Sequence, residues 1–224
     1  MNKTILDSSF ILHPSSFILW EGVPAMKTLT FDDLLPLDEF ASRRREFFEA
    51  HGRYLDRYRR VRIGSSLTLL FENRQTLWFR LQEVLRVARL SEPAQVQPEL
   101  DLYNRLLPRR NRLQAALLLK VDDARLSEEL AAWQDLRGDD LCLNLGDAHY
   151  PANLLTCRPE DRCIGTAHWV QFVLDERGQQ LLGDFDLPAH FAVRRPNYRY
   201  DSPLLSEEVR QSLLEDLQMS ERDG

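Results

Sequence analysis

The sequence contains little glycine, few cysteines and almost no lysine. With nine glycines in 224 residues, neither GxGxxG nor GxxxxGK[ST], the patterns of phosphate-binding loops, occurs. Three cysteines at irregular spacing are too few for a disulfide framework, and an odd number without a secretory signal favours a reducing compartment. We therefore expect a cytoplasmic protein, and no sequence motif identifies a reaction, a metal or a cofactor.

Acidic residues slightly outnumber basic residues in this sequence. The formal net charge is -6, which disfavours whole-protein attraction to nucleic acid or to an anionic membrane, so we expect neither as a partner. The basic residues are 26 arginines and three lysines. Arginine forms planar, bidentate contacts with carboxylate and phosphate, although a GC-rich genome explains the same bias. Local basic patches therefore remain candidate anion sites.

The first 25 residues differ from the rest because the pentapeptide SSFIL occurs twice, at Ser8 and at Ser15. Two copies are too few for a solenoid, which needs at least about three stacked units. The apolar run is interrupted by His13 and Pro14 and is too short for a signal peptide or a membrane span. We predict that residues 1–25 are a disordered or spurious extension, that residues 26–219 form a single domain, and that residues 220–224 are a disordered tail.

The periodicity of apolar residues predicts an α+β fold. A long amphipathic N-terminal helix with a basic outer face is expected from about Asp38 to Arg60. Leu67–Phe71 has the pattern of a buried strand, and Asn73 is a natural N-cap for the next helix. Further elements are predicted as helices at 98–107, 124–136, 176–182 and after Ser206, and as strands at 115–121, 141–145, 165–174 and 185–194. This order indicates one mixed or largely antiparallel sheet with helices packed on its faces. We expect the LTLLF, AALLLKV and HWVQFVL strands to lie side by side, roofed by the helix at 77–90.

Several ordered blocks resemble a bacterial family catalogued as domain of unknown function 3501 (DUF3501). They are LTFDDLLPLDEF, LTLLFENRQTLWFRLQEVLR, ELDLYNRLLP with RLQAALLLKVDD, TAHWVQFVL, and RPNYRYDSPLLSEEVRQSLLEDL. The resemblance covers about residues 27–217 and implies a cytoplasmic bacterial protein without established catalytic residues. It also implies a genomic neighbourhood that often contains a rubrerythrin and an iron-sulfur oxidoreductase. An accessory or interaction protein of such a redox or oxidative-stress system is the function that we favour at this point.

Metal binding and nucleophilic catalysis have weak support. Five soft or borderline ligands occur close together in the sequence, at Cys142, His149, Cys157, Cys163 and His168. Zinc and iron sites usually take ligands from close pairs such as C-x-x-C, and none is present here. No general base is placed beside Cys157 or Cys163, although arginines in the intervening loop could lower a thiol pKa. We predict no metal site.

Anion recognition is the most specific signal from the arginines. The candidates fall in two short windows and are Arg59, Arg60, Arg62, Arg109, Arg110 and Arg112. A run of charge on a helix is usually a solvated face, and the acidic C-terminal stretch could pair with these residues inside the fold. These arginines therefore form either a nucleotide or phosphate site or a surface whose charge is met by solvent and by internal ion pairs.

A last group of polar residues is predicted to lie among apolar neighbours, where each needs a partner, because an unsatisfied buried polar group costs roughly 1–3 kcal/mol. These pocket candidates are Glu72, Arg74, Glu83, Tyr103, Asn104 and His168. They form either ordinary structural contacts or one small pocket, where burial could shift a pKa towards neutrality. The alternative function is accordingly a small-molecule enzyme or anion-binding module that uses Glu72, Arg74, Glu83 and His168. The oligomeric state is open.

Overall fold

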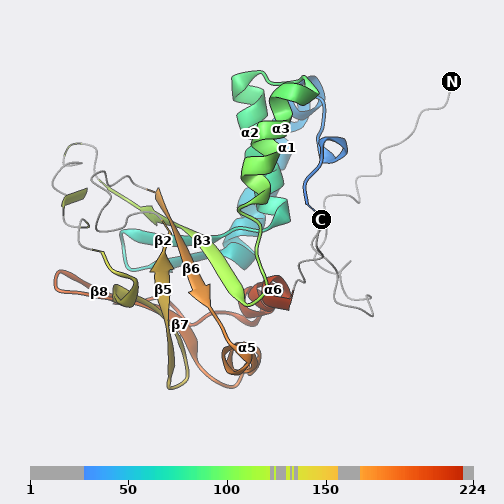
Figure 1. The fold of residues 1–224 in the computed structure, drawn as a ribbon. Helices are drawn as coiled ribbons and strands as arrows, with labels where there is room; N and C mark the ends of the chain where they lie inside the picture. The colour runs from blue at the N-terminus through green and yellow to red at the C-terminus, as the bar shows by residue number, and fades with distance from the viewer. Residues whose placement is uncertain are drawn as a thin grey trace.

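The computed structural model describes residues 28–121, 124, 130–131, 133, 136–155 and 167–218. The predicted extension at 1–25, the tail at 220–224 and most of the helix expected at 124–136 lie outside these residues. Figure 1 shows a strongly curved sheet with one group of helices projecting from it and a second group packed at its lower end. The helices are α1 (Leu37–Tyr54), α2 (Arg74–Ala88), α3 (Pro93–Asn104), α5 (Glu176–Gly183) and α6 (Glu207–Gln218), with short 3-10 turns η3 (Phe31–Asp33) and η6 (Gly138–Asp140).

Within the described residues, the sheet has eight strands in the order β1-β2-β3-β6-β5-β4-β7-β8. Every neighbouring pair is antiparallel, which confirms the predicted α+β class with a largely antiparallel sheet. The strands are β1 (Arg60–Ile63), β2 (Leu67–Phe71), β3 (Arg112–Leu119), β4 (Leu141–Leu145), β5 (Ala148–Leu154), β6 (Ala167–Val173), β7 (Ala189–Arg195) and β8 (Tyr198–Asp201). The LTLLF, AALLLKV and HWVQFVL strands are adjacent, as expected from their continuous apolar composition.

The sheet is nearly closed into a barrel at the turn between β1 and β2. The hydroxyl of Tyr198, on β8, donates to the carbonyl of Ile63 at 2.6 Å and accepts from the amide of Ser66 at 3.0 Å. Gly64 in that turn has φ +63°, and a Cβ there would lie 2.5 Å from the Tyr198 hydroxyl. Glycine is therefore required both by the backbone conformation and by the close approach of the tyrosine.

The main core lies inside this barrel. Alternate residues of the strands face inward, among them Leu69, Phe71, Phe172 and Phe191, and α6 adds Leu213 to the same cluster. The apolar stripe of α2 does not belong to it. Leu77, Leu81 and Leu85 pack instead with residues of α3 and of the chain before α1, in a second cluster. The expectation that the helix at 77–90 roofs the three central strands is therefore wrong, because a wide apolar face can be buried equally well between helices.

Several element boundaries differ from the prediction. Helix α1 ends at Tyr54, continues as a π turn, η4, through Leu55–Arg59, and gives way to β1 at Arg60, so the long N-terminal helix is only partly present. Helix α3 begins at Pro93 and contains Pro98, whereas the sequence predicts a helix that starts at Pro98. Strands β1, β5 and β8 were missed. Strands β5 and β8 have mostly exposed or half-exposed positions without a clear apolar alternation, and β1 alternates over only four residues directly after a helix. Backbone pairing with neighbouring strands holds all three in place.

Candidate functional site

The candidate site lies on the face of β3 and β6 that is turned away from the barrel core. Four successive cross-strand pairs occupy this face: Arg112 with Val173, Gln114 with Gln171, Ala116 with Trp169, and Leu118 with Ala167. The opposite face carries core residues such as Leu113, Leu117, Val170 and Phe172. Because side chains alternate along a strand, the pair of strands has an apolar inner surface and an outer surface whose polarity changes along the strands. The outer face changes from charged, through amide, to apolar.

A hollow of about 320 Å³ lies at the charged end of this face. We call it the arginine hollow; its described lining residues are Arg105, Leu106, Arg109, Arg112, Gln114, Leu155, Trp169 and Gln171. Three of these carry a positive charge and none carries a negative one. The Gln114 and Gln171 side chains are each 9% exposed. Within the described part of the chain, neither amide has a hydrogen-bond partner, so both are open to a ligand.

A tight turn presents two of these arginines. Asn111 adopts a left-handed conformation with φ 62°, which asparagine tolerates better than most residues. Its side-chain oxygen accepts a hydrogen bond from Gln179 at 2.8 Å, and its backbone N–H donates to the carbonyl of Leu217 at 3.2 Å. The amide of Arg112 closes the turn by donating to the carbonyl of Arg109 at 2.9 Å. The sequence PRRNR thus forms a turn anchored to two other elements, which limits how far Arg109 and Arg112 can move.

A second hollow of about 180 Å³ lies at the apolar end of the same face. We call it the His51 hollow; the residues that line it are His51, Leu55, Leu70, Glu72, Arg80, Ala116, Leu118, Ala167, His168 and Trp169. Trp169 therefore borders both hollows. The His51 ring stacks on Phe79 with the ring centres 4.2 Å apart. Burial, together with the charges of Arg60 and Arg80, lowers the pKa of His51 to about 4, so its imidazole is neutral near pH 7.

The charged groups of the His51 hollow compensate one another. Glu72 is 3% exposed and forms an ion pair with Arg80. Its other carboxylate oxygen accepts a hydrogen bond from the Thr76 hydroxyl at 2.5 Å. The guanidinium of Arg80 also lies over the Trp169 ring, 5.7 Å from its centre. His51 is neutral and the charges of Glu72 and Arg80 offset each other, whereas the described lining of the arginine hollow contains three arginines and no acid.

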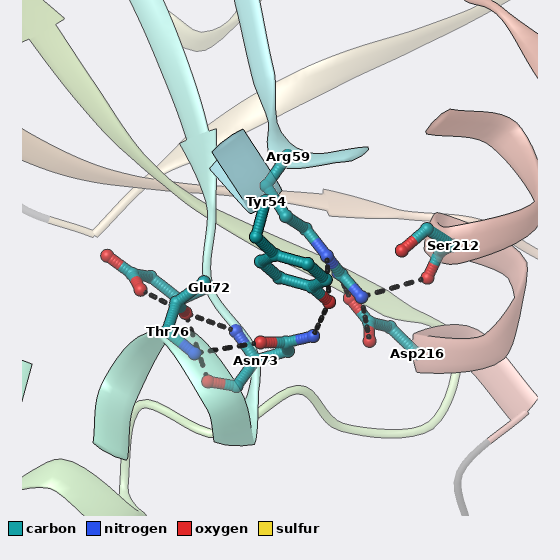
Figure 2. Close-up of polar contacts among 7 residues, drawn as sticks. All are labelled: Tyr54, Arg59, Glu72, Asn73, Thr76, Ser212 and Asp216. Atoms are coloured by element: carbon teal, nitrogen blue, oxygen red, sulfur yellow. Dashed lines mark hydrogen bonds and ion pairs between the residues drawn. The ribbon is translucent and has the colours of Figure 1, made fainter. Parts of the chain in front are cut away.

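A buried polar network leads from Glu72 into the protein (Figure 2). Thr76, which bonds Glu72, donates its backbone N–H to the side-chain oxygen of Asn73 at 3.0 Å, and the Asn73 amide donates to the Tyr54 hydroxyl at 2.8 Å. The same hydroxyl accepts from Arg59 Nε at 3.3 Å. The network thereby joins α2, α1 and η4 through side chains that satisfy one another, which orders Glu72 at the hollow.

Arg59 ends this network in an ion pair with Asp216 on α6. Its guanidinium also donates to the carbonyl of Ser212 at 3.3 Å. Burial raises the pKa of Asp216 to about 6, against the opposing charge of Arg59. Arg59 is 2% exposed, so the expectation that it binds an external anion is wrong: it was placed on a solvated helix face, whereas the π turn directs it inward.

The other five anion candidates lie in three different surroundings. Arg60 and Arg62 both approach the Asp56 carboxylate, Arg62 at 3.6 Å, so an acid of the same segment offsets part of their charge. Arg109 and Arg112 line the arginine hollow. Arg110, between them in the turn, is exposed and is not among the residues that line it.

The six pocket candidates are not brought together. Glu72 and His168 border the His51 hollow, but His168 is paired with Leu117 on the core face of the sheet, so its side chain belongs to the other side. Arg74 forms an ion pair with Asp33 at 2.8 Å. Glu83 lies elsewhere on α2, where it accepts from Arg44 at 2.9 Å and from Arg86 at 3.1 Å. The predicted combination of Glu72, Arg74, Glu83 and His168 is therefore not one site.

Tyr103 and Asn104 are parts of the helical packing. Tyr103 is 9% exposed within the cluster formed by α2 and α3. The Asn104 amide holds the chain before η3, because its oxygen accepts from the Leu29 N–H at 2.8 Å and its nitrogen donates to the Leu29 carbonyl at 2.9 Å. Asn104 thus has the partners that burial requires, and neither residue lines either hollow.

Those soft ligands that the structure describes are also dispersed. Cys142 on β4 is half-buried, and burial raises the pKa of its thiol, which makes it a poor nucleophile. His149 on β5 bonds Asn144 at 2.7 Å. Cys157 and Cys163 lie outside the described residues. Within the described ranges, no three His, Cys, Asp or Glu side chains are arranged to hold a metal ion, and no described helix has the length and apolarity of a membrane span.

Sequence reasoning missed His51, Arg80, Arg105, Gln114, Trp169 and Gln171. The strand was expected to begin at Ala115, which left Gln114 in the preceding turn; it begins at Arg112. The pattern in TAHWVQFVL did contain a signal, because a strand that turns His168, Val170 and Phe172 to one face must turn Trp169 and Gln171 to the other. His51 and Arg80 gave no comparable signal, since only the packing of α1 and α2 brings them to the sheet.

Comparisons with known proteins extend this description. A family model described as "Protein of unknown function (DUF3501)" matches residues 28–217. A crystal structure of a protein of unknown function from Burkholderia pseudomallei is similar, with a TM-score of 0.76 and 27% sequence identity, covering 85% of this chain and 100% of that chain. No curated protein matches.

Proposed function

This chain belongs to the DUF3501 family of proteins of unknown function, and we propose that it is a binding module for a small organic anion, held in the arginine hollow. The observation that carries the proposal is the composition of that hollow: three arginines and two open glutamine amides, with no acid among its described lining residues. The charge is local, because the whole chain is acidic. A protein that concentrates positive charge in one concavity favours an anionic ligand there.

The groups present support recognition of a phosphate or a carboxylate. Guanidinium groups donate in a planar fork that matches both anions, and charge-assisted hydrogen bonds are roughly twice as strong as neutral ones. The amides of Gln114 and Gln171 can donate to an anion or bond a neighbouring polar group of the ligand. We assign no reaction to this site, since its lining contains no nucleophile or general base.

Titration of the purified protein with inorganic phosphate by calorimetry tests the proposal. We expect saturable binding in wild type and a loss of about tenfold or more in Arg112→Gln, since a charged hydrogen bond contributes about 1.5–3 kcal/mol. Arg110→Gln is the matched control, because it removes the same charge from the same turn at a residue outside the hollow lining. Equal losses in the two variants would show general attraction to a basic turn and would refute the proposal.

An accessory role beside a rubrerythrin or an iron-sulfur oxidoreductase, in the cytoplasm, stays a prediction that rests on the family resemblance. A pull-down from the native host tests it separately. Recovery of a rubrerythrin-like or iron-sulfur partner would support it, and repeated failure to recover one would count against it. Anion binding in the hollow does not depend on either result.

A further inference from the structure

The two hollows belong to one continuous face, and Trp169 lines both of them. Along β3 this face presents Arg112, Gln114, Ala116 and Leu118 in that order. At about 3.3 Å per residue, Gln114 and Leu118 are separated by roughly 13 Å along the strand. The face is therefore long enough for a small organic molecule that lies along the strands with its two ends in different surroundings.

The two ends differ in charge. The arginine hollow has three cationic side chains. In the His51 hollow, Glu72 is paired with Arg80 and with Thr76, and the remaining described lining is mostly apolar, with Leu55, Leu70, Leu118 and Trp169. A free ionic group would gain nothing there, whereas a hydrocarbon would be removed from water beside an aromatic ring.

From this gradient we propose that the ligand is an amphiphilic anion, whose charged head lies in the arginine hollow and whose apolar body passes Trp169 into the His51 hollow. The inference rests on the proposed function and names the class of ligand that this site takes. Ala116, which lines the His51 hollow directly opposite Trp169, is small and 5% exposed, so it adds little bulk on the path past the indole edge, one ring face of which Arg80 covers. The neutral His51 imidazole adds no charge at the apolar end.

A series of alkyl phosphates tests the inference. Methyl, butyl and hexyl phosphate share one head and differ only in buried methylene groups, each of which is worth up to about fourfold in affinity, from ~0.8 kcal/mol per methylene. We expect hexyl phosphate to bind at least about tenfold more tightly than methyl phosphate. Comparing hexanoate with hexyl phosphate identifies which anionic head the hollow prefers. Tighter binding of longer chains, with either head, supports an amphiphilic anion as the ligand.

Two variants separate the head from the body. Ala167→Leu adds bulk at an exposed position that borders only the His51 hollow. We expect it to reduce the advantage of hexyl over methyl phosphate to below about threefold and to leave methyl phosphate binding unchanged. Arg112→Gln should weaken every member of the series by a similar factor. Val87→Leu, on an exposed position of α2 away from both hollows, controls for added hydrophobic surface.

The outcomes distinguish this inference from the proposed function. If methyl and hexyl phosphate bind equally and both depend on Arg112, the anion site stands and the amphiphilic ligand is refuted. If Ala167→Leu leaves the advantage of hexyl phosphate unchanged, the apolar body does not lie in the His51 hollow and the inference is also refuted. If neither a member of the series nor hexanoate binds, the proposed function itself fails.

Discussion

Arg59 and Asp216 form an ion pair inside the protein, although 157 positions separate them in the sequence. Their side chains are 2% and 6% exposed. Arg59 belongs to the π turn that follows α1 and Asp216 to α6, so the pair ties the start of the sheet to the helix that closes the lower end of the barrel (Figure 1). Two desolvated charges are tolerated there because the carboxylate, a main-chain carbonyl and Tyr54 accept the guanidinium hydrogens.

Removing one partner of this pair should destabilise the protein strongly. Arg59→Met leaves the Asp216 carboxylate buried without its cation, and we expect a loss of about 3–5 kcal/mol in the free energy of unfolding, measured with urea. The double variant Arg59→Met with Asp216→Leu should recover most of that loss, because no charge remains buried. Arg60→Met is the control, since its partner Asp56 is exposed and such pairs contribute about 0–1 kcal/mol. Equal losses for Arg59→Met and Arg60→Met would contradict the burial argument.

His51 should make stability depend on pH. Its pKa falls from 6.5 to about 4 on folding, so between these values the unfolded chain binds the proton more readily and the folded state loses stability as the pH decreases. Because the ring is only half-buried, we expect about 1–2 kcal/mol from this group rather than the full shift. His51→Phe keeps a ring against Phe79 and should remove that part of the dependence between pH 7 and pH 4.5. Carboxylates, including Asp216, titrate in both proteins and cancel in the difference, so identical pH profiles would contradict the prediction.

The difference between Leu67–Phe71 and Arg60–Ile63 shows what could be predicted from the sequence. Leu67–Phe71 is buried in the centre of the sheet, and its unbroken apolar composition was sufficient to identify it. Arg60–Ile63 is a four-residue edge strand directly after a helix; its short alternation continues the basic helical pattern before it, and its pairing with β2 shows that it is extended. The local sequence indicates which segments are buried, whereas the formation of an edge strand depends on backbone hydrogen bonds with a neighbouring strand.

The candidate site was predictable only in part for the same reason. Arg109 and Arg112 could be selected because a cluster of charge in a turn is visible in the sequence. His51 and Arg80 could not, because they come from two helices that only tertiary packing brings next to β3 and β6. Glu72 was selected correctly as a buried carboxylate, yet its partners Thr76 and Arg80 are determined by the way α2 leaves β2.

Gly64 should be intolerant of substitution. Gly64→Ala places a methyl group in a left-handed turn and against Tyr198, whose hydroxyl is held by two hydrogen bonds and cannot move freely. We expect a loss of about 2 kcal/mol or more in the free energy of unfolding. Gly52→Ala is the matched control: it lies inside α1, a Cβ there meets nothing within 4 Å, and alanine should stabilise the helix by about 0.5–1 kcal/mol. Losses of similar size in the free energy of unfolding of both variants would show that the contact between Tyr198 on β8 and the β1–β2 turn does not depend on this glycine.

Asn111 should link the conformation of the basic turn to anion binding. Alanine at this position keeps no hydrogen bond to Gln179 and must adopt φ 62°, which costs about 1–2 kcal/mol for a residue with a Cβ, in addition to about 1 kcal/mol for the bond. Glycine loses the same hydrogen bond but adopts the conformation without strain, so Asn111→Gly should retain more stability than Asn111→Ala.

The same pair of variants tests whether the turn preorganises Arg109 and Arg112. We expect Asn111→Ala to weaken inorganic phosphate binding by several-fold, because a turn that relaxes to negative φ redirects both arginines and the ligand must then restore their positions at the expense of affinity. Asn111→Gly should bind within about twofold of wild type, since it keeps the backbone geometry. Calorimetric titration of the three proteins measures this directly, and an equal affinity in Asn111→Ala and wild type would mean that the arginines reach the anion without the turn that presents them.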